Sequence, residues 1–203
     1  MIKHKFITFE GIEGCGKSTQ SKKLQQHLES LGIDSILTRE PGGSEVGEKI
    51  RQILIEEQEN QLSPKSELLL NFAARIEHIN HKIKPAIDQG KIVISDRFYD
   101  STYAYQGYGL GLDLNLIDQI KQNAIGDFAP DITFLIDIDP EQSFLRVKNR
   151  PGNNRYEDLS KEFHQRIHQG FLDLAKDNPR IAIIDGSTDI DSIFNQIKTK
   201  LEL

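Results

Sequence analysis

The stretch Phe6–Thr19, which reads FITFEGIEGCGKST, decides the fold of this chain. Its first four residues are apolar or β-branched and predict a short buried strand. The eight residues at positions 11–18, GIEGCGKS, match the pattern G-x-x-x-x-G-K-[ST] without a gap. Leu24, Leu28 and Leu31 then follow at helical spacing. A strand, a glycine-rich loop and a helix in this order predict a loop that binds the phosphates of a nucleoside triphosphate.

The residue types of this loop suit the phosphates of a nucleoside triphosphate. Glycines let successive backbone N–H groups turn towards a phosphate chain, and the helix N-terminus adds its positive end. We expect Lys17 to reach the β- and γ-phosphates and the Ser18 hydroxyl to bind Mg²⁺. The alternative is a glycine-rich turn that merely precedes a helix, but the complete spacing and the flanking elements favour the phosphate-binding loop. The predicted ATP-binding residues are Gly11, Ile12, Glu13, Gly14, Cys15, Gly16, Lys17, Ser18 and Thr19.

The composition is that of a globular protein of one domain. Its 203 residues can bury a full core, since 37% are hydrophobic and 28% are charged. The net charge of −6 gives a nucleic-acid partner no electrostatic support. The single cysteine excludes an intramolecular disulfide, and no apolar run is long enough for a membrane span. Because the start MIKHKFITFE lacks a signal-peptide core, we expect a cytoplasmic protein.

Four further apolar runs resemble the first strand, namely SILT at 35–38, KIVIS at 91–95, ITFLI at 132–136 and IAII at 181–184. Such short runs are typical of strands that are buried on both faces. Helical patterns lie between them, at 17–31, 45–57, 64–89, 113–125, 140–150, 159–177 and 189–201. Strands that alternate with helices predict an α/β fold, with a five-stranded parallel sheet, helices on both faces and a single domain over residues 1–203.

Polar residues follow the third predicted strand, at the carboxyl edge where open α/β sheets bind ligands. Asp96 and Arg97 come directly after KIVIS. Beside a phosphate-binding loop, such an aspartate holds Mg²⁺ directly or through water, so Ser18 and Asp96 are the predicted metal site. The arginine offers a planar fork to a phosphate, and a surface Asp–Arg pair is the alternative. His78 and His81 fit no zinc pattern and are interpreted as solvated or packed.

Residues 146–157 are predicted to form a lid. Four cations lie in ten residues from Arg146 to Arg155, around a Pro-Gly-Asn-Asn turn. Arginines brought over the γ-phosphate by such a lid would stabilise the charge of the transition state, and closure would exclude water. A solvated basic loop is the alternative. The acidity of the chain as a whole makes a local cationic cluster more informative and favours the lid.

A candidate base-binding face lies on the helix predicted over 64–89. Asn71 and Arg75 are four residues apart and share a face, with Phe72 next to it. An aromatic ring and an arginine can together stack on a base and donate to its carbonyl, although a lone phenylalanine is more often a core residue. The stretch STYAYQG at 101–107 adds hydroxyls and an amide in a density that is unusual for a helix.

Taken together, FEGIEGCGKST, TREPGG, DRFYDSTYAYQG and the basic segment ending in NRYE resemble the thymidylate (dTMP) kinase family. The resemblance runs from Phe6 to Glu157, with the motifs in the family's order and spacing. It implies a P-loop kinase that transfers the γ-phosphoryl group of ATP to dTMP and makes dTDP for dTTP biosynthesis. It also implies Mg²⁺ as the cofactor and a homodimer.

The resemblance assigns parts to single residues around the sugar and the phosphates. Glu13 matches the acidic position that contacts the sugar of dTMP, and Tyr105 matches the aromatic that crowds the 2′ position. Arg51 and Arg97 match positions that hold the acceptor phosphate, and Glu40 lies in the same pocket. The predicted substrate-binding residues are Glu13, Glu40, Arg51, Phe72, Arg75, Arg97, Ser101, Tyr105 and Gln106.

At the base, Arg75 matches the arginine that reads the thymine carbonyl, while Ser101 and Gln106 match polar contacts to the base and its surroundings. The chain departs from several relatives at Asn71, where they carry an aromatic residue four positions before that arginine. Phe72 is expected to take over the stacking.

The family has two branches, which differ in where the catalytic arginine lies. One branch carries it in the P-loop, and the other has a glycine there and supplies arginines from the lid. Gly14 and the lid residues Arg150 and Arg155 resemble the second branch. The predicted catalytic residues are Lys17, Arg97, Arg150 and Arg155.

Two other functions stay open at this point. One is a kinase for another nucleoside monophosphate or for a deoxynucleoside, which a panel of acceptors would separate from a dTMP kinase. The other is a P-loop switch protein that signals through its nucleotide state. A switch would need a guanine-binding N-K-x-D element, and none follows the fourth predicted strand.

Overall fold

A computed structural model describes residues 3–55, 62–147, 160–176 and 178–203. Its central feature is an all-parallel sheet of five strands in the order β2-β3-β1-β4-β5. This arrangement confirms the predicted α/β fold and each of the five predicted strands. The strands are β1 (Phe6–Glu10), β2 (Ser35–Arg39), β3 (Ile92–Asp96), β4 (Ile132–Asp137) and β5 (Ile181–Asp185).

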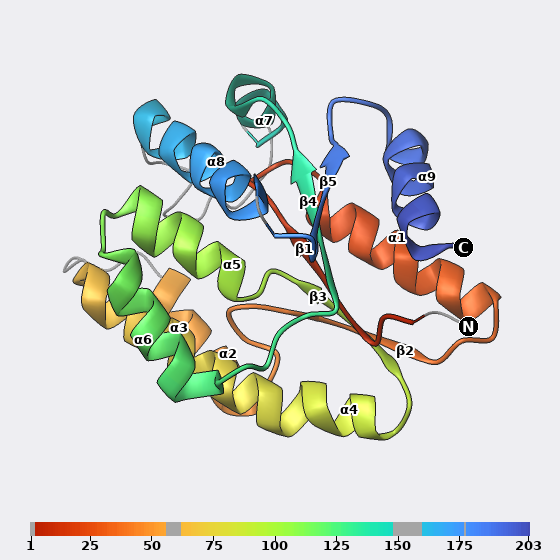
Figure 1. Cartoon of the computed structure of the whole chain (residues 1–203), viewed down its shortest axis with the longest axis horizontal. Helices are drawn as coiled ribbons and strands as arrows, with labels where there is room; N and C mark the ends of the chain where they lie inside the picture. Colours follow the sequence, from red (N-terminus) through yellow and green to blue (C-terminus); the bar gives the residue numbers. More distant parts are fainter. Residues whose placement is uncertain (1–2, 56–61, 148–159, 177) are drawn as a thin grey trace.

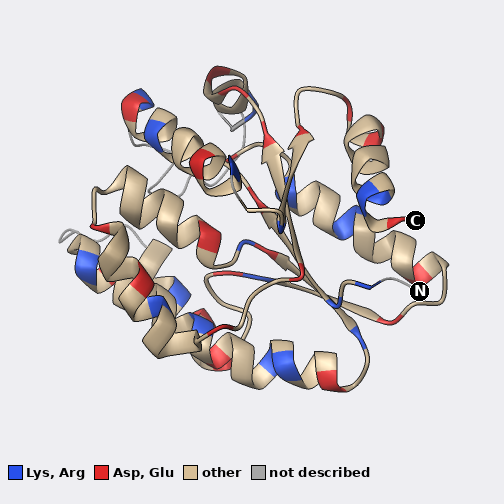
Figure 2. Ribbon diagram, in the orientation of Figure 1, with Lys and Arg blue, Asp and Glu red and all other residues tan. Residues whose placement is uncertain are grey.

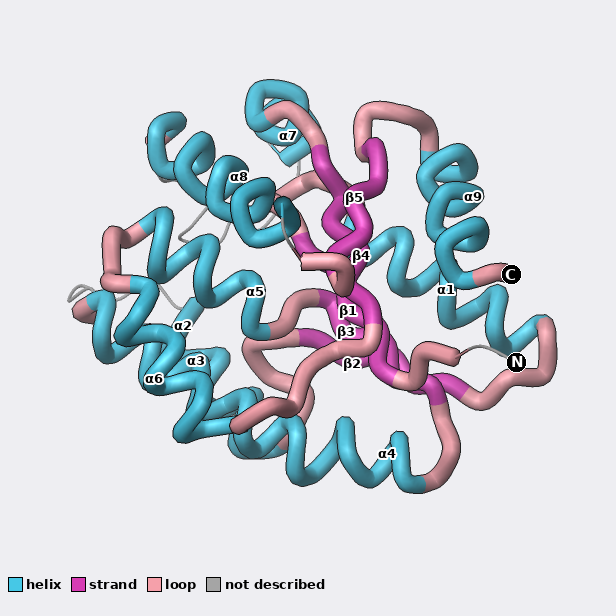
Figure 3. The backbone as a smooth tube through the Cα atoms, in the orientation of Figure 1, coloured by secondary structure: helices cyan, strands magenta, loops and turns pink. Residues whose placement is uncertain are grey.

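Helices connect the strands and cover both faces of the sheet (Figure 1). They are α1 (Lys17–Ser30), α2 (Glu45–Ile55), α3 (Pro64–His78), α4 (Lys84–Asp88), α5 (Tyr99–Thr102), α6 (Leu114–Ile125), α7 (Pro140–Val147), α8 (Lys161–Lys176) and α9 (Ile190–Leu201), with π-helical segments η1 (Ile79–Ile83) and η2 (Tyr103–Gly109). In the tube drawing, α1 and α9 lie on one side of the strands, and α3, α4, α6 and α8 lie on the other (Figure 3).

The sheet is buried because its central strands β1, β3 and β4 consist mainly of apolar residues. All five residues of β1 are buried, and so are the first five of β4. Leu24 and Leu28 of α1 pack with β1 and β4 in one core cluster, and Phe6 and Val93 join α3 residues in a second. Burial of apolar surface on both faces is what a parallel sheet requires.

Two helical stretches depart from the predicted pattern. The helix predicted over 64–89 is interrupted by η1, a π-helical segment between α3 and α4. The polar stretch 101–107 forms the end of α5 and most of η2. A π turn adds one residue to a helical turn, which apolar spacing alone does not reveal. Such segments are frequent at functional sites, and Tyr105 and Gln106 of η2 line the cavity described below.

Charged residues of both signs are interspersed over the helices, as Figure 2 shows for α3, α4 and α9. No helix in the described ranges combines the length and the apolar character that crossing a bilayer requires. The strand register brings the functional loops together, because Asp96 pairs with Phe9 on one side and with Arg39 on the other. The loops after β1, β2 and β3 therefore meet at one edge of the sheet.

Candidate active site

A cavity lies at this carboxyl edge and is lined by all three loops together with α1, α2, α3 and η2. It contains most of the residues predicted from the sequence, together with neighbours that the sequence did not indicate. Its lining residues are Glu13, Gly14, Gly16, Lys17, Ser18, Thr19, Arg39, Glu40, Pro41, Arg51, Leu54, Ile55, Asn71, Arg75, Asp96, Arg97, Phe98, Ser101, Thr102, Tyr105 and Gln106.

The glycine-rich loop has the geometry of an anion cradle. Gly16 adopts a left-handed conformation with φ of 106° and starts α1 without a side-chain cap, so the first amide groups of the helix point towards the loop. Gly11 packs so closely on β4 that an added Cβ would lie 2.6 Å from the carbonyl oxygen of Ile136. Lys17 donates to the carbonyl oxygens of Gly11 at 3.0 Å and Ile12 at 2.8 Å. The loop therefore wraps around its lysine.

The side chains of Ile12 and Cys15 turn away from the cavity and into the core. Both side chains are buried in the core cluster that contains β1 and β4. Cys15 lies 3.5 Å from the ammonium nitrogen of Lys17. The apolar side chains thus anchor the loop to the sheet while its amide groups remain available for phosphates.

Ser18 and Asp96 form the pair of oxygen ligands predicted for a metal. The Ser18 hydroxyl donates to Oδ2 of Asp96 at 2.5 Å, across the gap between α1 and β3. Within the described part of the chain, no group of three or more His, Cys, Asp or Glu residues could hold a metal ion by itself. One carboxylate and one hydroxyl suit Mg²⁺, which keeps several waters and completes its shell with substrate phosphates. The residues present therefore fit that ion.

Arg97 is the centre of an electrostatic cluster rather than the partner of Asp96. It donates to Glu13 at 2.7 Å, Ser101 at 2.9 Å and Tyr105 at 3.0 Å. Burial alone would raise the pKa of Glu13, but the charges of Arg97 and Lys17 outweigh it and lower the pKa to about 2. Arg97 has a φ of 71°, which non-glycine residues seldom adopt, so these contacts hold a strained backbone.

Glu10, which was not predicted as a site residue, supports the loop that carries Arg97. Its carboxylate accepts from the backbone N–H of Phe98 at 2.7 Å and from the Ser101 hydroxyl at 2.5 Å. Burial and the nearby Asp100 carboxylate raise the pKa of Glu10 to about 7. Glu10 ends a strand that reads as purely structural, and only the fold shows that it lies under the site.

Arg51 on α2 enters the cavity from the side of β2. It donates to the carbonyl oxygen of Pro41 at 2.9 Å. Its pKa is lowered by burial and by the positive charge of Arg39. A partly buried guanidinium close to a second arginine is a place where an added anion is favourable. This environment suits the predicted contact with the acceptor phosphate.

Arg75, which also lines the cavity, is held in a fixed plane by its partners. It is 2% exposed and donates through Nε to Glu40 at 2.7 Å and through one terminal nitrogen to Thr102 at 3.1 Å. Its guanidinium carbon lies 4.8 Å from the ring centre of Phe72 and 5.4 Å from that of Phe98. The other terminal nitrogen, Nη1, is buried and has no hydrogen-bond partner among the described residues. Arg75 thus keeps one donor for a ligand.

Phe72 does not take the place predicted for it. It is 2% exposed, belongs to the second core cluster and does not line the cavity, whereas Asn71 does. The Asn71 amide donates to the backbone carbonyl oxygen of Glu67 at 2.9 Å. Stacking of a base on Phe72 therefore finds no support in this structure, because the ring faces the guanidinium of Arg75 from the core side.

The remaining predicted residues of η2 also reach the cavity. Gln106 donates to the buried carboxylate of Glu67 at 2.6 Å, and Tyr105 contacts Glu13 and Arg97. The lid arginines Arg150 and Arg155 lie outside the described residues. Sequence reasoning missed the cavity residues Thr102 and Phe98, although both stand within the motif DRFYDSTYAYQG that carried the family resemblance.

Comparisons with known proteins agree with this geometry. The family model for thymidylate kinase matches residues 9–197. A thymidylate kinase of Syntrophotalea carbinolica is 45% identical over 199 residues, which cover 95% of this chain and 92% of the relative. One of Carboxydothermus hydrogenoformans is 45% identical over 201 residues, covering 99% and 98%. The crystal structure of thymidylate kinase from Ehrlichia chaffeensis matches with a TM-score of 0.79 at 43% identity, over 98% of each chain. This chain belongs to the thymidylate kinase family.

Proposed function

We propose that the cavity described above is where this chain transfers the γ-phosphoryl group of Mg-ATP to dTMP, giving dTDP. The observation that carries the proposal is the buried Nη1 of Arg75, which has no hydrogen-bond partner among the described residues and belongs to a side chain that lines the same cavity as the P-loop. A fixed guanidinium nitrogen donates well to a carbonyl oxygen, such as O4 of thymine, and poorly to the amino group that cytosine carries there.

In this proposal the reaction depends on positioning and charge neutralisation. The P-loop amides and Lys17 hold the donor phosphates, and Arg51 and Arg97 hold the acceptor phosphate. A phosphate oxygen of dTMP is already a nucleophile, so no strong general base is needed. Ser18 and Asp96 would hold Mg²⁺, which neutralises charge on the phosphates when it is bound. Glu13 and Tyr105, fixed by Arg97, would face the sugar.

The chain segments outside the cavity have proposed parts as well. Residues 146–157 act as a lid that brings Arg150 and Arg155 to the γ-phosphate and excludes water, within a single domain over 1–203. The protein acts as a homodimer. Exposed apolar side chains on α2 and α3, namely Val46, Ile53 and Leu69, are consistent with a partner surface there. A cytoplasmic location suits a chain whose single cysteine is buried and free.

The test is ADP production from Mg-ATP with separate acceptors and a control without acceptor. The acceptors are dTMP, dUMP, UMP, CMP, AMP, GMP and thymidine. We expect dTMP to give the highest kcat/KM. Preference for another monophosphate would keep the P-loop kinase and contradict the base pocket. The absence of acceptor-dependent turnover would contradict kinase activity and favour a nucleotide switch.

A further inference from the structure

His78 is a buried histidine that the proposed reaction does not use directly. It lies one helical turn after Arg75 on α3, with no exposed surface, just before η1 begins. Its Nδ1 is 2.9 Å from Oε1 of Glu40, and its Nε2 is 2.7 Å from the hydroxyl oxygen of Thr38. His78 thus connects the end of β2 to the carboxylate that holds Arg75.

The partners of His78 define where its protons lie. The Glu40 carboxylate accepts from the guanidinium of Arg75 through Oε2, and its Oε1 is the acceptor that faces Nδ1 of His78. Nδ1 of His78 must then carry a proton and donate to Glu40. In the neutral imidazole Nε2 accepts from the Thr38 hydroxyl, and this tautomer satisfies both ring nitrogens. In this tautomer, donation runs from Thr38 through His78 to Glu40.

Glu40 has one oxygen on each partner. Oε2 accepts from Nε of Arg75 and Oε1 accepts from His78, so the carboxylate plane is fixed from both sides. A carboxylate held only by Arg75 could rotate together with the guanidinium. The buried Nη1 of Arg75 must meet a base carbonyl at hydrogen-bond distance. A small rotation of the guanidinium would therefore weaken that hydrogen bond and the recognition of the base.

The loop after Glu40 is packed onto the same imidazole. Gly43 has a φ of 82°, and a Cβ added there would lie 2.4 Å from Cδ2 and Nε2 of His78 and 2.8 Å from the Thr38 hydroxyl. The imidazole is fully buried and cannot move aside. The second glycine of REPGG therefore allows the loop to close over His78, which locks the histidine between the loop and α3.

We propose that His78 is a positioning residue for the base of dTMP: together with Thr38 it holds Glu40 in the orientation that presents Arg75 to the thymine carbonyl. The inference rests on the proposed function, since it assumes that Arg75 reads the base. It assigns no contact between His78 and the substrate. The expected consequence is for acceptor recognition, because the hydrogen bonds of His78 lead from Thr38 to Glu40 and through Glu40 to Arg75.

Two replacements of His78 separate positioning from packing. Asparagine can place an amide N–H near the position of Nδ1 and keep the bond to Glu40, whereas glutamine places its amide near Nε2 and loses that bond. We expect His78→Gln to lower kcat/KM for dTMP by about tenfold to hundredfold, and His78→Asn by no more than about threefold. KM for ATP should change by less than about twofold in both. Packing alone predicts the opposite order, because asparagine leaves the larger cavity.

Base discrimination provides the second readout. The ratio of kcat/KM for dTMP over dCMP should fall in His78→Gln and stay close to wild type in His78→Asn. The matched control is His81→Asn, three residues further along, whose side chain is 69% exposed and whose partner is Glu77. Its kinetics should equal those of the wild type. Thermal unfolding of each variant shows whether it is folded at the assay temperature.

The result that overturns the inference is equal loss of dTMP and ATP efficiency in both His78 variants, or no loss in His78→Gln. If His78→Gln does not fold, Thr38→Val and Thr38→Ser take its place. Valine should lower kcat/KM for dTMP several-fold and serine should restore it, and equal values for the two would overturn the inference. A wild-type protein without dTMP-dependent turnover would instead contradict the proposed function itself.

Discussion

Two parts of the cavity are built in different ways. We call the part lined by the P-loop the phosphate end and the part lined by Arg75 the base end. At the phosphate end, the backbone of one continuous loop and its own Lys17 form the site, and the loop contacts Asp96 and Arg97 at the next strand. At the base end, Arg75 is held by Glu40 from the loop after β2 and by Thr102 from α5, and His78 contacts Glu40 in turn. The first is a local structure and the second is assembled from three distant segments.

This difference has consequences for energy and for function. A backbone cradle at a helix N-terminus tolerates many side-chain changes outside its motif, because the binding groups are amides. A buried charged network depends on every member, since loss of one partner leaves an unpaired buried charge. We therefore expect changes at the phosphate end to affect turnover, and changes at the base end to affect the choice and binding of the acceptor.

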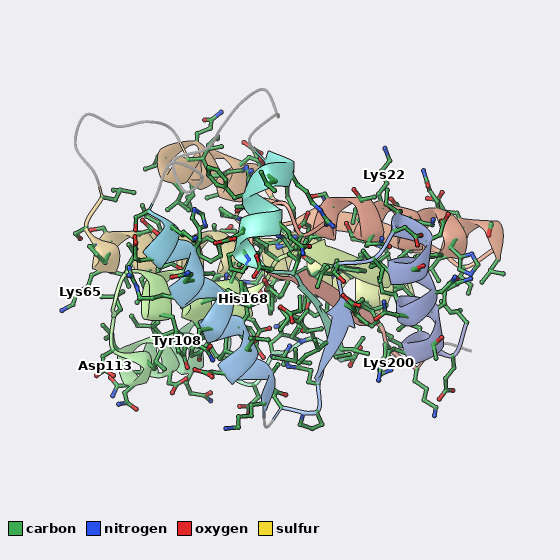
Figure 4. The ribbon with its side chains drawn as sticks, turned by 90° about the horizontal axis from the view of Figure 1, so that it is seen from above. Lys22, Lys65, Tyr108, Asp113, His168 and Lys200 are labelled. Carbon is green, nitrogen blue, oxygen red and sulfur yellow. The ribbon has the colours of Figure 1, made fainter. Side chains whose placement is uncertain are left out.

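The largest expected effect is at Lys17. Lys17→Met should lower kcat by about 10³-fold, because the ammonium stabilises the charge of the transferred group, while dTMP binding should change little. The matched control is Lys22→Met, since Lys22 projects outwards from the same helix (Figure 4). ADP release under saturating substrates measures the effect. Loss of dTMP binding in Lys17→Met would contradict the expectation that changes at the phosphate end affect turnover and leave acceptor binding intact.

Removal of a metal ligand is expected to have the next effect. Asp96→Asn should lower kcat by about 10²-fold at a fixed Mg²⁺ concentration and raise the Mg²⁺ concentration needed for half-maximal rate. EDTA should abolish the wild-type activity, and added Mg²⁺ should restore it. A titration of rate against Mg²⁺ checks both points. An unchanged Mg²⁺ requirement in Asp96→Asn would contradict the assignment of that ligand.

At the base end, Arg75→Lys should lower kcat/KM for dTMP by about tenfold to hundredfold. Lysine keeps the charge but cannot donate to Glu40, Thr102 and a base carbonyl in one plane. KM for ATP should stay within about twofold of the wild-type value. Steady-state kinetics with dTMP and dCMP measure the change. Equal losses for both acceptors would show that Arg75 stabilises the pocket without reading the base.

The smallest effect concerns Glu10 and stability. Its pKa is about 7 in the folded protein against an ordinary value of 4.5, so between these pH values the folded state holds a proton that the unfolded chain has lost. The contribution of this group to stability is therefore present at low pH and is lost as pH rises towards 7. Relative to Glu10→Gln, wild type should lose roughly 1–3 kcal/mol of unfolding free energy between pH 5 and pH 8.

Urea unfolding of both proteins at the two pH values tests this prediction. The difference in unfolding free energy between wild type and Glu10→Gln removes the contribution of the other titrating groups. Glu29→Gln, which changes an exposed residue of α1, is the control. A difference between wild type and Glu10→Gln that does not vary with pH would show that Glu10 is already ionised at pH 5. The charge of Glu10 beneath Arg97 would then be the same at both pH values.

The strand, loop and helix that form the phosphate end could be predicted from the sequence. Strand β1, the loop and α1 follow one another in the chain, so spacing and periodicity define them, and Asp96 follows from its place at the end of an apolar run. The base end could not be derived in this way. Helical spacing singled out Arg75, and the density of polar groups singled out the stretch that holds Gln106. The contacts that fix these residues join positions 35 or more apart and leave no local pattern.

The residues whose surroundings the sequence did not predict also depend on segments that are distant along the chain. Phe72 was expected to replace an absent aromatic, yet the local turn of α3 directs it into the core and leaves Asn71 at the cavity. Glu10 looked like the end of a buried strand, and its part under Arg97 depends on β3 lying beside β1. His78 was interpreted as solvated or packed, and it is packed, but its two partners come from β2 and the loop after it.

One measurement tests most directly whether the phosphate end serves turnover and the base end serves acceptor binding. It is the equilibrium dissociation constant of dTMP for Lys17→Met, for Arg75→Lys and for wild type. We predict that Lys17→Met binds dTMP as tightly as wild type within about twofold, although its turnover is nearly lost, and that Arg75→Lys binds it at least about tenfold more weakly. Equal dTMP affinities in Arg75→Lys and wild type, or weakened binding in Lys17→Met alone, would contradict the account.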